Sequence, residues 1–484
     1  MKIFNMTKDE IQNAVKNGKV TIAVYGLGNV GLPIALAYFS AGCNVIGVDI
    51  DHEKVDMLNS GINFLSHEPY VDGLLKEALK RGKFRATTDL IKTASEADVI
   101  SILVPTLADA SGKLKLNALF SAARAIGKGL QEGSVIILES TVPPGTTEGP
   151  LRKILEKESG LMAGEDFGLA FSPERVKSGT VIKDFLENYP KIVGGINDKS
   201  TDIVANFYEA IIRNRVIRVR NARTAEAAKV FKGVYRYVNI ALANELAIIS
   251  EHIGVDVKEV IDAANTEPYS HIHHPGAGVG GHCIPVYPLF LTYIAGKLGV
   301  DLKLTQTARI INNAMPFHVV NLVIEGLNEA GKPVKGSKIT IFGLTFRGDV
   351  KATYLSPAKP IIERLKRLKA RIVAHDPYLT DEEVNREFGV KRVDDIENAF
   401  VEADCVVFVA DHKMYSNLNL EVLVDLMNKP PVIIDGRNIF DLNAIKNLDG
   451  VIYRGVGRGG DIFAQGYPEV VKLLERDLLG ENLD

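Results

Sequence analysis

The chain has 484 residues, of which 46% are hydrophobic and 24% are charged, and its formal net charge is -3. This is the composition of a soluble globular protein with two or three domains, and the small net charge gives no indication of a nucleic-acid or anionic-membrane partner. The three cysteines, Cys43, Cys283 and Cys405, are too few and too scattered for a disulfide framework. Residues 1–19 lack the apolar core of a signal peptide, and no apolar run approaches the ~18 residues of a membrane span. We therefore expect a cytoplasmic protein.

A dinucleotide-binding pattern lies near the N-terminus. A β-rich run at 20–25 leads directly into Gly26-Leu-Gly28-Asn-Val30-Gly31, which is followed by a helical pattern and a second strand at 44–48. Asp49 comes next, about twenty residues after the glycines, as the dinucleotide fingerprint requires. Helix N-terminal amides suit a pyrophosphate, and Asp49 is expected to accept the ribose hydroxyls and repel a 2′-phosphate, which favours NAD over NADP. The expected cofactor contacts here are Gly26, Gly28, Val30, Gly31, Asp49 and Lys54.

Polar residues follow three further predicted strands. Thr106 and Thr141 come just after strands predicted at 98–104 and 134–139, and a third strand ends at Ser172-Pro-Glu-Arg175. Because functional loops in such sheets lie at the carboxyl ends of strands, both threonines are expected to face the cofactor. Threonine is also a good helix cap, so a purely structural role is the alternative.

A long helical pattern runs over 224–252, with Thr224 suited to its N-cap and a glycine just beyond its end. At 1.5 Å per residue such a helix approaches the width of a domain, and we expect it to be a central spine and a dimer interface. Lys229, Gly233 and Arg236 are spaced to lie on one face of this helix. The alternative for Lys229 is an ordinary solvated lysine.

Cys283 lies in the loop Pro275-Gly-Ala-Gly-Val-Gly-Gly-His-Cys-Ile-Pro-Val-Tyr-Pro288. Four glycines leave the thiol without neighbouring side chains that would shield it, and prolines stiffen the chain just beyond it. Structural cysteines belong in apolar runs, whereas reactive ones lie in partly exposed, polar settings. The loop therefore predicts a nucleophilic Cys283, with a small buried hydrophobe as the alternative.

The order of predicted strands and turns found in the first region recurs after a Gly-Lys-Pro boundary at 331–333. A strand at 338–342 precedes Gly343-Leu-Thr-Phe346, and two later strands repeat the earlier order without a G-x-G-x-x-G motif. We therefore predict an α/β fold of two doubly wound, Rossmann-like parallel-sheet domains joined by a long central helix. The second domain is expected to bind something other than the dinucleotide pyrophosphate, through Arg347, Lys351 and Arg437.

Together these motifs resemble the nucleotide-sugar 6-dehydrogenase family over essentially 20–466. The segments Ser-Pro-Glu-Arg-Val176, Val-Asn-Ile-Ala-Leu-Ala-Asn-Glu245 and Gly-Gly-His-Cys-Ile-Pro285 are closest to the branch that oxidises UDP-N-acetylmannosamine and related 2-acetamido sugars. The UDP-glucose branch usually has a phenylalanine at the position of Arg175 and a second carboxylate at that of Ser178.

The resemblance implies a four-electron oxidation of the sugar C6 hydroxyl to a carboxylate, using two NAD in turn. Cys283 would be the nucleophile, Lys229 the proton donor and acceptor that also stabilises the oxyanion, and Glu174 the carboxylate that assists thioester hydrolysis through water. Domains are expected at 1–218 (NAD binding), 219–332 (central helix and cysteine loop) and 333–484 (UDP-sugar binding), in a homodimer or higher homo-oligomer formed through the central helix. The implied substrate contacts are Arg175, Val176, Lys229, Gly233, Arg236, His271, His273, Gly280, Phe346, Arg347 and Arg437.

The chain departs from the family pattern at several pocket positions. Gly233 replaces an asparagine one turn after the lysine, and Tyr287 replaces an aspartate after Cys-Ile-Pro-Val. Glu267 and Tyr269 stand where the family has basic residues, and Lys351-Ala-Thr-Tyr stands for Asp-Asp-x-Arg. The family's asparagine and aspartate help to hold the hydrolytic water. We interpret the chain as a distinct subgroup with an altered pocket and intact catalytic residues.

Other functions fit parts of the pattern. UDP-N-acetylglucosamine or UDP-glucose is an alternative substrate, a two-electron hydroxyacid or sugar-phosphate dehydrogenase shares the first domain and long helix, and a non-catalytic nucleotide-sugar sensor would fit Gly233 and Tyr287. A metal site is the remaining alternative, since His271, His273, His274 and His282 lie close to the cysteine along the chain. Their spacing is not that of a zinc site, and no metal is expected.

Overall fold

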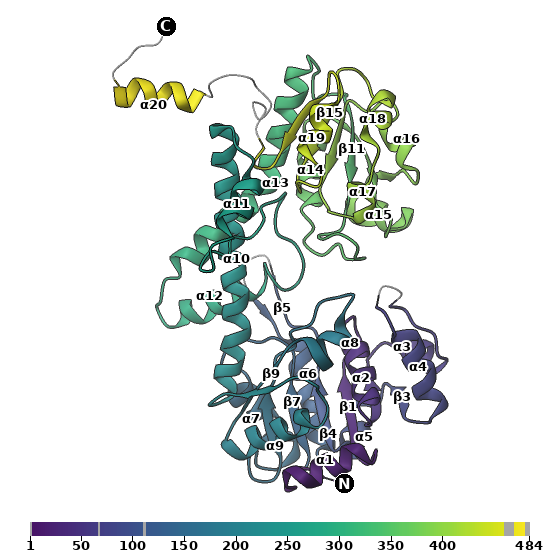
Figure 1. Cartoon of the computed structure of the whole chain (residues 1–484). Helices are drawn as coiled ribbons and strands as arrows, with labels where there is room; N and C mark the ends of the chain where they lie inside the picture. The colour runs from purple at the N-terminus through teal and green to yellow at the C-terminus, as the bar shows by residue number, and fades with distance from the viewer. Residues whose placement is uncertain (1, 66–67, 110–112, 459–468, 480–484) are drawn as a thin grey trace. The chain divides into compact units, whose positions relative to one another are not determined.

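The computed structural model describes residues 2–65, 68–109, 113–458 and 469–479 (Figure 1). The chain divides into two compact units, Met1–Gly233 with Val286–Asp301, and Val234–Pro285 with Leu302–Asp484. Among the helices in the described ranges, none combines the length and apolar character needed to cross a membrane.

An eight-stranded sheet forms the centre of the first unit, in the order β10-β9-β8-β7-β4-β1-β2-β3. Neighbouring strands pair in parallel, except β8 and β9, which are antiparallel. The strands are β1 Thr21–Tyr25, β2 Asn44–Val48, β3 Phe84–Thr87, β4 Val99–Ile102, β7 Val135–Leu138, β8 Gly168–Phe171, β9 Lys191–Gly195 and β10 Val216–Arg218, with a separate antiparallel pair of β5 Leu107–Ala108 and β6 Leu114–Lys115. Strands β4, β7 and β8 are buried throughout, which explains their continuous apolar runs.

Helices cover both faces of this sheet. Ile22 and Val24 of β1 belong to one hydrophobic cluster with residues of α2 and α9, whereas Ala23 and Tyr25 belong to another with residues of α6. The helices of this unit are α1 Lys8–Lys16, α2 Gly31–Ser40, α3 His52–Asn59, α4 Val71–Lys80, α5 Leu90–Glu96, α6 Asn117–Gly129, α7 Arg152–Ser159, α8 Val181–Lys183, α9 Asp198–Glu209 and α12 Tyr287–Lys297. The predicted doubly wound architecture is confirmed.

The long helix α10 spans Ala222–Ile253 and contains the boundary between the two units at Gly233 (Figure 1). It begins earlier than predicted, because the side-chain oxygen of Asn221 accepts hydrogen bonds from the Thr224 amide at 2.9 Å and the Thr224 hydroxyl at 2.9 Å. The prediction that Thr224 is the N-cap was therefore wrong: this residue lies in the first turn of the helix, which is capped by the asparagine before it.

A six-stranded, all-parallel sheet forms the core of the second unit, in the order β13-β12-β11-β14-β15-β16. Its strands are β11 Lys338–Phe342, β12 Arg371–His375, β13 Lys391–Arg392, β14 Cys405–Phe408, β15 Val432–Asp435 and β16 Ile452–Gly455. The other elements are α11 Val257–Ala264, α13 Lys303–Glu329, α14 Ala358–Arg367, α15 Asp381–Phe388, α16 Ile396–Phe400, α17 Lys413–Ser416, α18 Leu420–Leu423, α19 Leu442–Lys446 and α20 Glu469–Leu479. Residues of α13 and α14 share one cluster with Ile339 and Ile341, and residues of α16 and α18 share another with Phe342, so this sheet too is covered on both faces.

Candidate active site

Glycine is required for a different physical reason at each of the three fingerprint positions of the first unit. Gly26 has φ +100°, and a Cβ there would lie 2.7 Å from the Leu103 carbonyl oxygen. A Cβ on Gly31 would lie 1.8 Å from the Gly26 oxygen, so these two positions are set by the turn and by helix packing. A Cβ on Gly28 would meet nothing within 4 Å. That open space beside the start of α2 is what a pyrophosphate requires, and the residues fit NAD.

The polar groups around this turn also fit a dinucleotide. Helix α2 begins after Val30 with no side-chain cap and no acid in its first turn, so its amides are left for an anion. The Asp49 carboxylate accepts the Leu27 amide at 2.9 Å, which ties the end of β2 to the glycine turn. Lys54 places Nζ 3.2 Å from Asp49 Oδ2, so these two expected cofactor contacts lie side by side after β2.

Thr106 and Thr141 are brought together at the carboxyl ends of the neighbouring strands β4 and β7. The Thr106 hydroxyl donates to the Thr141 carbonyl oxygen at 2.6 Å, and both residues are buried. Neither caps a helix, since α6 begins after Leu116 and the π-helical turn Thr147–Leu151 begins after Thr146. The helix-cap alternative is therefore wrong for both residues.

Glu226 supports the segment that follows Thr141, a role the sequence analysis missed. From the first turns of α10, its fully buried carboxylate accepts the Gly145 amide at 2.5 Å, the Thr147 amide at 2.8 Å and the Thr147 hydroxyl at 2.6 Å. Burial raises the pKa of this carboxyl to about 7, against the lowering effect of the three donors.

Lys229 lies one turn further along α10 and is only 7% exposed, so its interpretation as a solvated lysine is wrong. Its ammonium donates to the Glu174 main-chain oxygen and lies 3.4 Å from Glu174 Oε2. The ammonium also lies 5.6 Å from the centre of the Tyr287 ring. The first unit thus brings together a lysine and a carboxylate that the sequence separates by more than fifty residues.

A buried ion pair lies behind Glu174. Lys191 Nζ is 2.7 Å from Glu139 Oε2, and both side chains are almost completely buried. The other carboxylate oxygen accepts hydrogen bonds from Tyr38 at 2.9 Å and Ser101 at 2.7 Å. Burial lowers the pKa of Lys191, and the charge of Glu139 opposes this shift. The Glu174 amide donates to the Glu139 carbonyl oxygen at 3.3 Å, so the main chain links this ion pair to the candidate catalytic residue.

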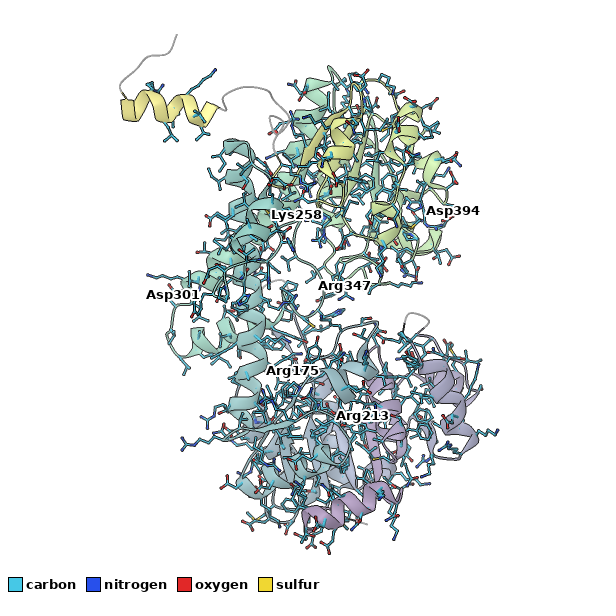
Figure 2. The ribbon with its side chains drawn as sticks, viewed as in Figure 1. Arg175, Arg213, Lys258, Asp301, Arg347 and Asp394 are labelled. Carbon is cyan, nitrogen blue, oxygen red and sulfur yellow. The ribbon has the colours of Figure 1, made fainter. Side chains whose placement is uncertain are left out.

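The two residues after Glu174 fix the local chain. The Val176 amide donates to Glu174 Oε1 at 2.5 Å, which leaves Oε2 on the side of Lys229. The Arg175 guanidinium donates to the Pro190 carbonyl oxygen, and its burial lowers the pKa of this arginine. Figure 2 labels Arg175 on the first unit.

The second unit carries the cysteine loop. Cys283 is exposed, whereas Cys43 and Cys405 are buried and burial raises the pKa of both thiols, for Cys43 to about 12. A raised pKa makes a thiol a poor nucleophile, so exposure singles out Cys283. The His282 ring stacks on Tyr354 with centroids 4.0 Å apart and planes at 12°, which fixes the residue before the cysteine.

Two of the loop glycines also have a packing role that the sequence did not predict. A Cβ on Gly280 would lie 2.5 Å from Phe346 Cβ, and Gly281, with φ +88°, would place a Cβ 2.8 Å from the Phe346 ring. The Gly281 amide donates to the Tyr354 main-chain carbonyl oxygen at 2.8 Å. These glycines let the loop lie against the segment after β11, and the expected substrate residues Gly280 and Phe346 are in contact with each other.

Two asparagines of α10 hold the chain before the loop. Asn239 donates to the His271 carbonyl oxygen at 2.8 Å and accepts the His273 amide at 2.7 Å. Asn244 accepts the Gly276 amide at 3.0 Å. His273 Nε2 is buried and has no hydrogen-bond partner among the described residues, and burial, with nearby Arg236, lowers the pKa of this histidine. A buried, unpartnered ring nitrogen is suited to a ligand.

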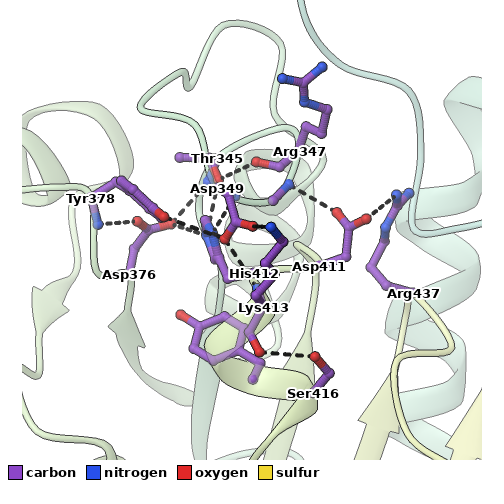
Figure 3. A network of polar contacts seen from close by, with 12 residues as sticks. Thr345, Arg347, Asp349, Asp376, Tyr378, Asp411, His412, Lys413, Ser416 and Arg437 are labelled. Atoms are coloured by element: carbon purple, nitrogen blue, oxygen red, sulfur yellow. Dashed lines mark hydrogen bonds and ion pairs between the residues drawn. The ribbon is translucent and has the colours of Figure 1, made fainter. Parts of the chain in front are cut away.

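A polar network at the carboxyl ends of β11, β12, β14 and β15 holds the guanidinium of Arg437 and the main-chain oxygen of Arg347 (Figure 3). Arg437 Nη2 lies 3.3 Å from Asp411 Oδ2, and a Cβ on Gly276 would lie 2.6 Å from Arg437 Nη1. The guanidinium of Arg347 points away from the network in Figure 3. Lys351, the third expected cation, instead forms an ion pair with Glu383 at 2.7 Å.

Asp376 holds the turn after β11 as Asp49 holds the turn after β1. Its Oδ2 accepts the Leu344 amide at 2.7 Å and lies 3.2 Å from His412 Nε2. His412 Nδ1 accepts the Asp349 amide at 2.9 Å, so the ring proton must lie on Nε2. The repeat seen in the sequence therefore extends to individual hydrogen bonds.

No group of three or more potential metal ligands comes together within the described ranges of the chain. His271 and His273 are instead the two histidines held by Asn239, and His282 is stacked on its tyrosine.

Three family descriptions match the chain in order. They are the NAD binding domain of the UDP-glucose/GDP-mannose dehydrogenase family at 20–212, its central domain at 223–314 and its UDP binding domain at 340–442. The chain belongs to this family. Its members are NAD-dependent dehydrogenases, and the fold predicted from the sequence pattern is confirmed.

The similar proteins in this family are named for different nucleotide sugars. The UDP-N-acetyl-D-mannosamine dehydrogenase of Pyrococcus horikoshii is 36% identical over 90% of this chain and 99% of its own. An NDP-N-acetyl-D-galactosaminuronic acid dehydrogenase of Ralstonia nicotianae is 35% identical over 88% and 97%. The solved UDP-D-ManNAc dehydrogenase of P. horikoshii covers 91% of this chain and 100% of its own, with a TM-score of 0.83 at 36% identity. The UDP-N-acetyl-mannosamine dehydrogenase of S. aureus covers 91% and 100%, with a TM-score of 0.77 at 32% identity.

Proposed function

We propose that this dehydrogenase oxidises the C6 hydroxyl of a UDP-2-acetamido sugar, UDP-N-acetylmannosamine, to the carboxylate. The observation that carries the proposal is the buried contact of Lys229 with Glu174 in the NAD-binding unit, combined with a cysteine that is exposed in the other unit. A simple two-electron dehydrogenase has no need of such a thiol. The relatives at 34–36% identity that are named for UDP-N-acetyl-D-mannosamine support the choice of sugar.

NAD, when bound, takes up a hydride in each of the two oxidations. Lys229 takes the proton of the C6 hydroxyl and then stabilises charge on the sugar oxygen. Cys283 adds its sulfur to the resulting aldehyde carbon and forms a thiohemiacetal, which the second oxidation converts to a thioester. Glu174 accepts a proton from the water that cleaves the carbon–sulfur bond, releasing the carboxylate and the thiol.

Substrate contacts are proposed for three groups of residues. Arg347 and Arg437 pair with the diphosphate, because guanidinium groups match phosphate oxygens in charge and geometry. His273 is supported by its unpartnered ring nitrogen, together with its neighbour His271. The other proposed contacts are Arg175, Val176, Gly233, Arg236, Gly280 and Phe346, within functional regions at 1–218, 219–332 and 333–484.

The test is NADH production over a panel of UDP-sugars, with mass analysis of the product. UDP-N-acetylmannosamine should give two NADH per sugar and a uronate. Cys283→Ser should trap a covalent intermediate or stop after the aldehyde. One NADH per sugar would support a two-electron dehydrogenase, and tight binding without turnover would support a sensor. A preference for UDP-N-acetylgalactosamine, UDP-glucose or UDP-N-acetylglucosamine would change the assigned substrate but not the proposed chemistry.

We also propose that the protein is a homodimer or higher homo-oligomer formed through α10. Phe231, Tyr235, Leu242 and Ile249 are 45–56% exposed and recur at intervals of four and seven residues, which places them on one helix face. Phe231→Glu with Leu242→Glu should shift the sedimentation of the protein to that of a monomer, and an unchanged species would refute this interface. A cytoplasmic location is proposed because a reactive thiol such as Cys283 needs a reducing compartment.

A further inference from the structure

Tyr287 is the aromatic residue that faces Lys229. The lysine ammonium has three N–H donors, and two of its contacts go to Glu174, at the main-chain oxygen and at Oε2. The ring of Tyr287 lies with its centre 5.6 Å from the same nitrogen, within the range at which a ring face attracts a cation. All of these groups belong to the first unit.

Gly233 makes the space that this ring occupies. A Cβ at position 233 would lie 3.3 Å from Tyr287 Cβ and 3.6 Å from its Cδ2. Glycine in the interior of a helix costs about 1 kcal/mol relative to alanine, and this glycine has an ordinary helical backbone, so the main chain does not require it. The contact gives glycine its reason: a Cβ at 3.3 Å is tighter than ordinary van der Waals contact, so the tyrosine would have to shift by a few tenths of an ångström, and a larger side chain would move it further.

The ring itself is held in position. Tyr287 is the first residue of α12 and is followed by Pro288, a residue that favours helix starts. Pro288, Leu289 and Phe290 are buried, and the Tyr287 and Phe290 rings have centroids 5.8 Å apart. The ring and the glutamate, each held by its own neighbours, together restrict the position of the Lys229 ammonium.

We propose that Tyr287 is a positioning residue for Lys229, holding the ammonium by a cation–π contact for which Gly233 provides the room. The inference rests on the proposed function in one respect, the use of Lys229 in the chemistry. Gly233 and Tyr287, which lie far apart in the sequence, would thus act together on the same lysine. The ring face thus adds a third contact to the two that the ammonium makes with Glu174.

The test replaces Tyr287 in the full-length protein by Phe and then by mono-, di- and trifluorinated phenylalanines, which keep the ring's shape but weaken its attraction for a cation. The kcat for NADH production should fall stepwise, by about tenfold over the series, with KM for the UDP-sugar unchanged. A constant kcat over the series would overturn the proposal, even if Tyr287→Leu were inactive, because the ring would then act only by filling space.

The same helix provides a matched control. Lys297 Nζ lies 5.8 Å from the ring centre of Tyr293, which is 42% exposed on α12. The same fluorinated series at position 293 should leave kcat unchanged. A parallel fall at both positions would overturn the proposal, since it would trace the effect to the stability of α12.

A second readout does not depend on turnover. With lysines labelled at Cε and the Lys229 signal assigned by its loss in Lys229→Arg, the ring should shift that signal upfield. Tyr287→Phe should keep the shift, while Tyr287→Leu and Gly233→Asn should abolish it. An unchanged signal in Tyr287→Leu overturns the proposal. Wild-type protein that makes no NADH with any UDP-sugar would refute the proposed function, and this spectrum would still decide the contact.

Discussion

The buried Glu226 makes stability depend on pH in a direction opposite to that of an ordinary acid. Its pKa is raised by burial to about 7 in the folded protein, compared with an ordinary 4.5. Below 4.5 the carboxyl is protonated in both states. Between 4.5 and 7 the unfolded chain loses the proton while the folded protein keeps it, so folding stability falls as the pH rises. Since each tenfold difference in proton affinity is worth about 1.4 kcal/mol, the loss across this window is about 3 kcal/mol.

Glu226→Gln removes this ionisation, so the difference in unfolding free energy between the variant and the wild type isolates it. At pH 4.5 the variant should be less stable, because its amide nitrogen faces the Gly145 amide and leaves a buried donor unpaired, at a cost of about 1–3 kcal/mol. As the pH rises to 7 the difference should move in favour of the variant by about 3 kcal/mol. Urea denaturation at half-unit pH steps measures this, with exposed Glu245→Gln on the same helix as control. A difference that stays flat, or moves in favour of the wild type, refutes the reasoning.

Three further changes test other parts of the site. Lys191→Met should lower the free energy of unfolding in urea by about 3–5 kcal/mol, because it leaves the buried Glu139 charge uncompensated, and wild-type stability would contradict this. Lys54→Ala should lower kcat/KM for NADP relative to NAD about fivefold, because the ammonium beside Asp49 offsets that carboxylate's repulsion of a 2′-phosphate; an unchanged ratio contradicts it. Arg437→Ala should weaken UDP binding about ten- to a hundredfold in calorimetry, and equal affinity would remove this residue from the diphosphate site.

The fold could be predicted because its signals are local. Strand, turn, helix and acid follow one another within thirty residues around Gly26 and Asp49, and the physical causes of each lie in that same stretch. The exposed thiol was also predictable, since Cys283 lies in a glycine- and proline-rich loop and Cys405 lies in an apolar run; the burial of Cys43, between Gly42 and Asn44, has no such local signal. The start of α10 was missed by two residues because an asparagine and a threonine, both good caps, lie three positions apart.

Contacts between distant segments could not be predicted. In the sequence, Gly233 is only the absence of the family's asparagine side chain, and Tyr287 only the absence of its aspartate. The structure shows that Gly233 makes space for Tyr287. The glycines before Cys283 predict an exposed thiol, and Cys283 is exposed; the close packing of Gly280 and Gly281 against Phe346, more than sixty residues later, could not be predicted. A single sequence contains no record of these neighbours, because each pair is joined only by packing.

The paired acids of the two sheets bear on how such a chain could be re-engineered. In the first domain Asp49 spends one oxygen on the turn, and its side chain is still 10% exposed. In the second, Asp376 is completely buried; His412 Nε2 lies 3.2 Å from the same Oδ2 that accepts the Leu344 amide, and Oδ1 accepts the Tyr378 amide at 2.9 Å. Grafting the glycine turn of the first domain onto the second would therefore not create a second cofactor site. Two acids at matching places in two similar folds thus differ in use: Asp49 keeps a partly exposed carboxylate, whereas Asp376 serves only the interior of its own domain.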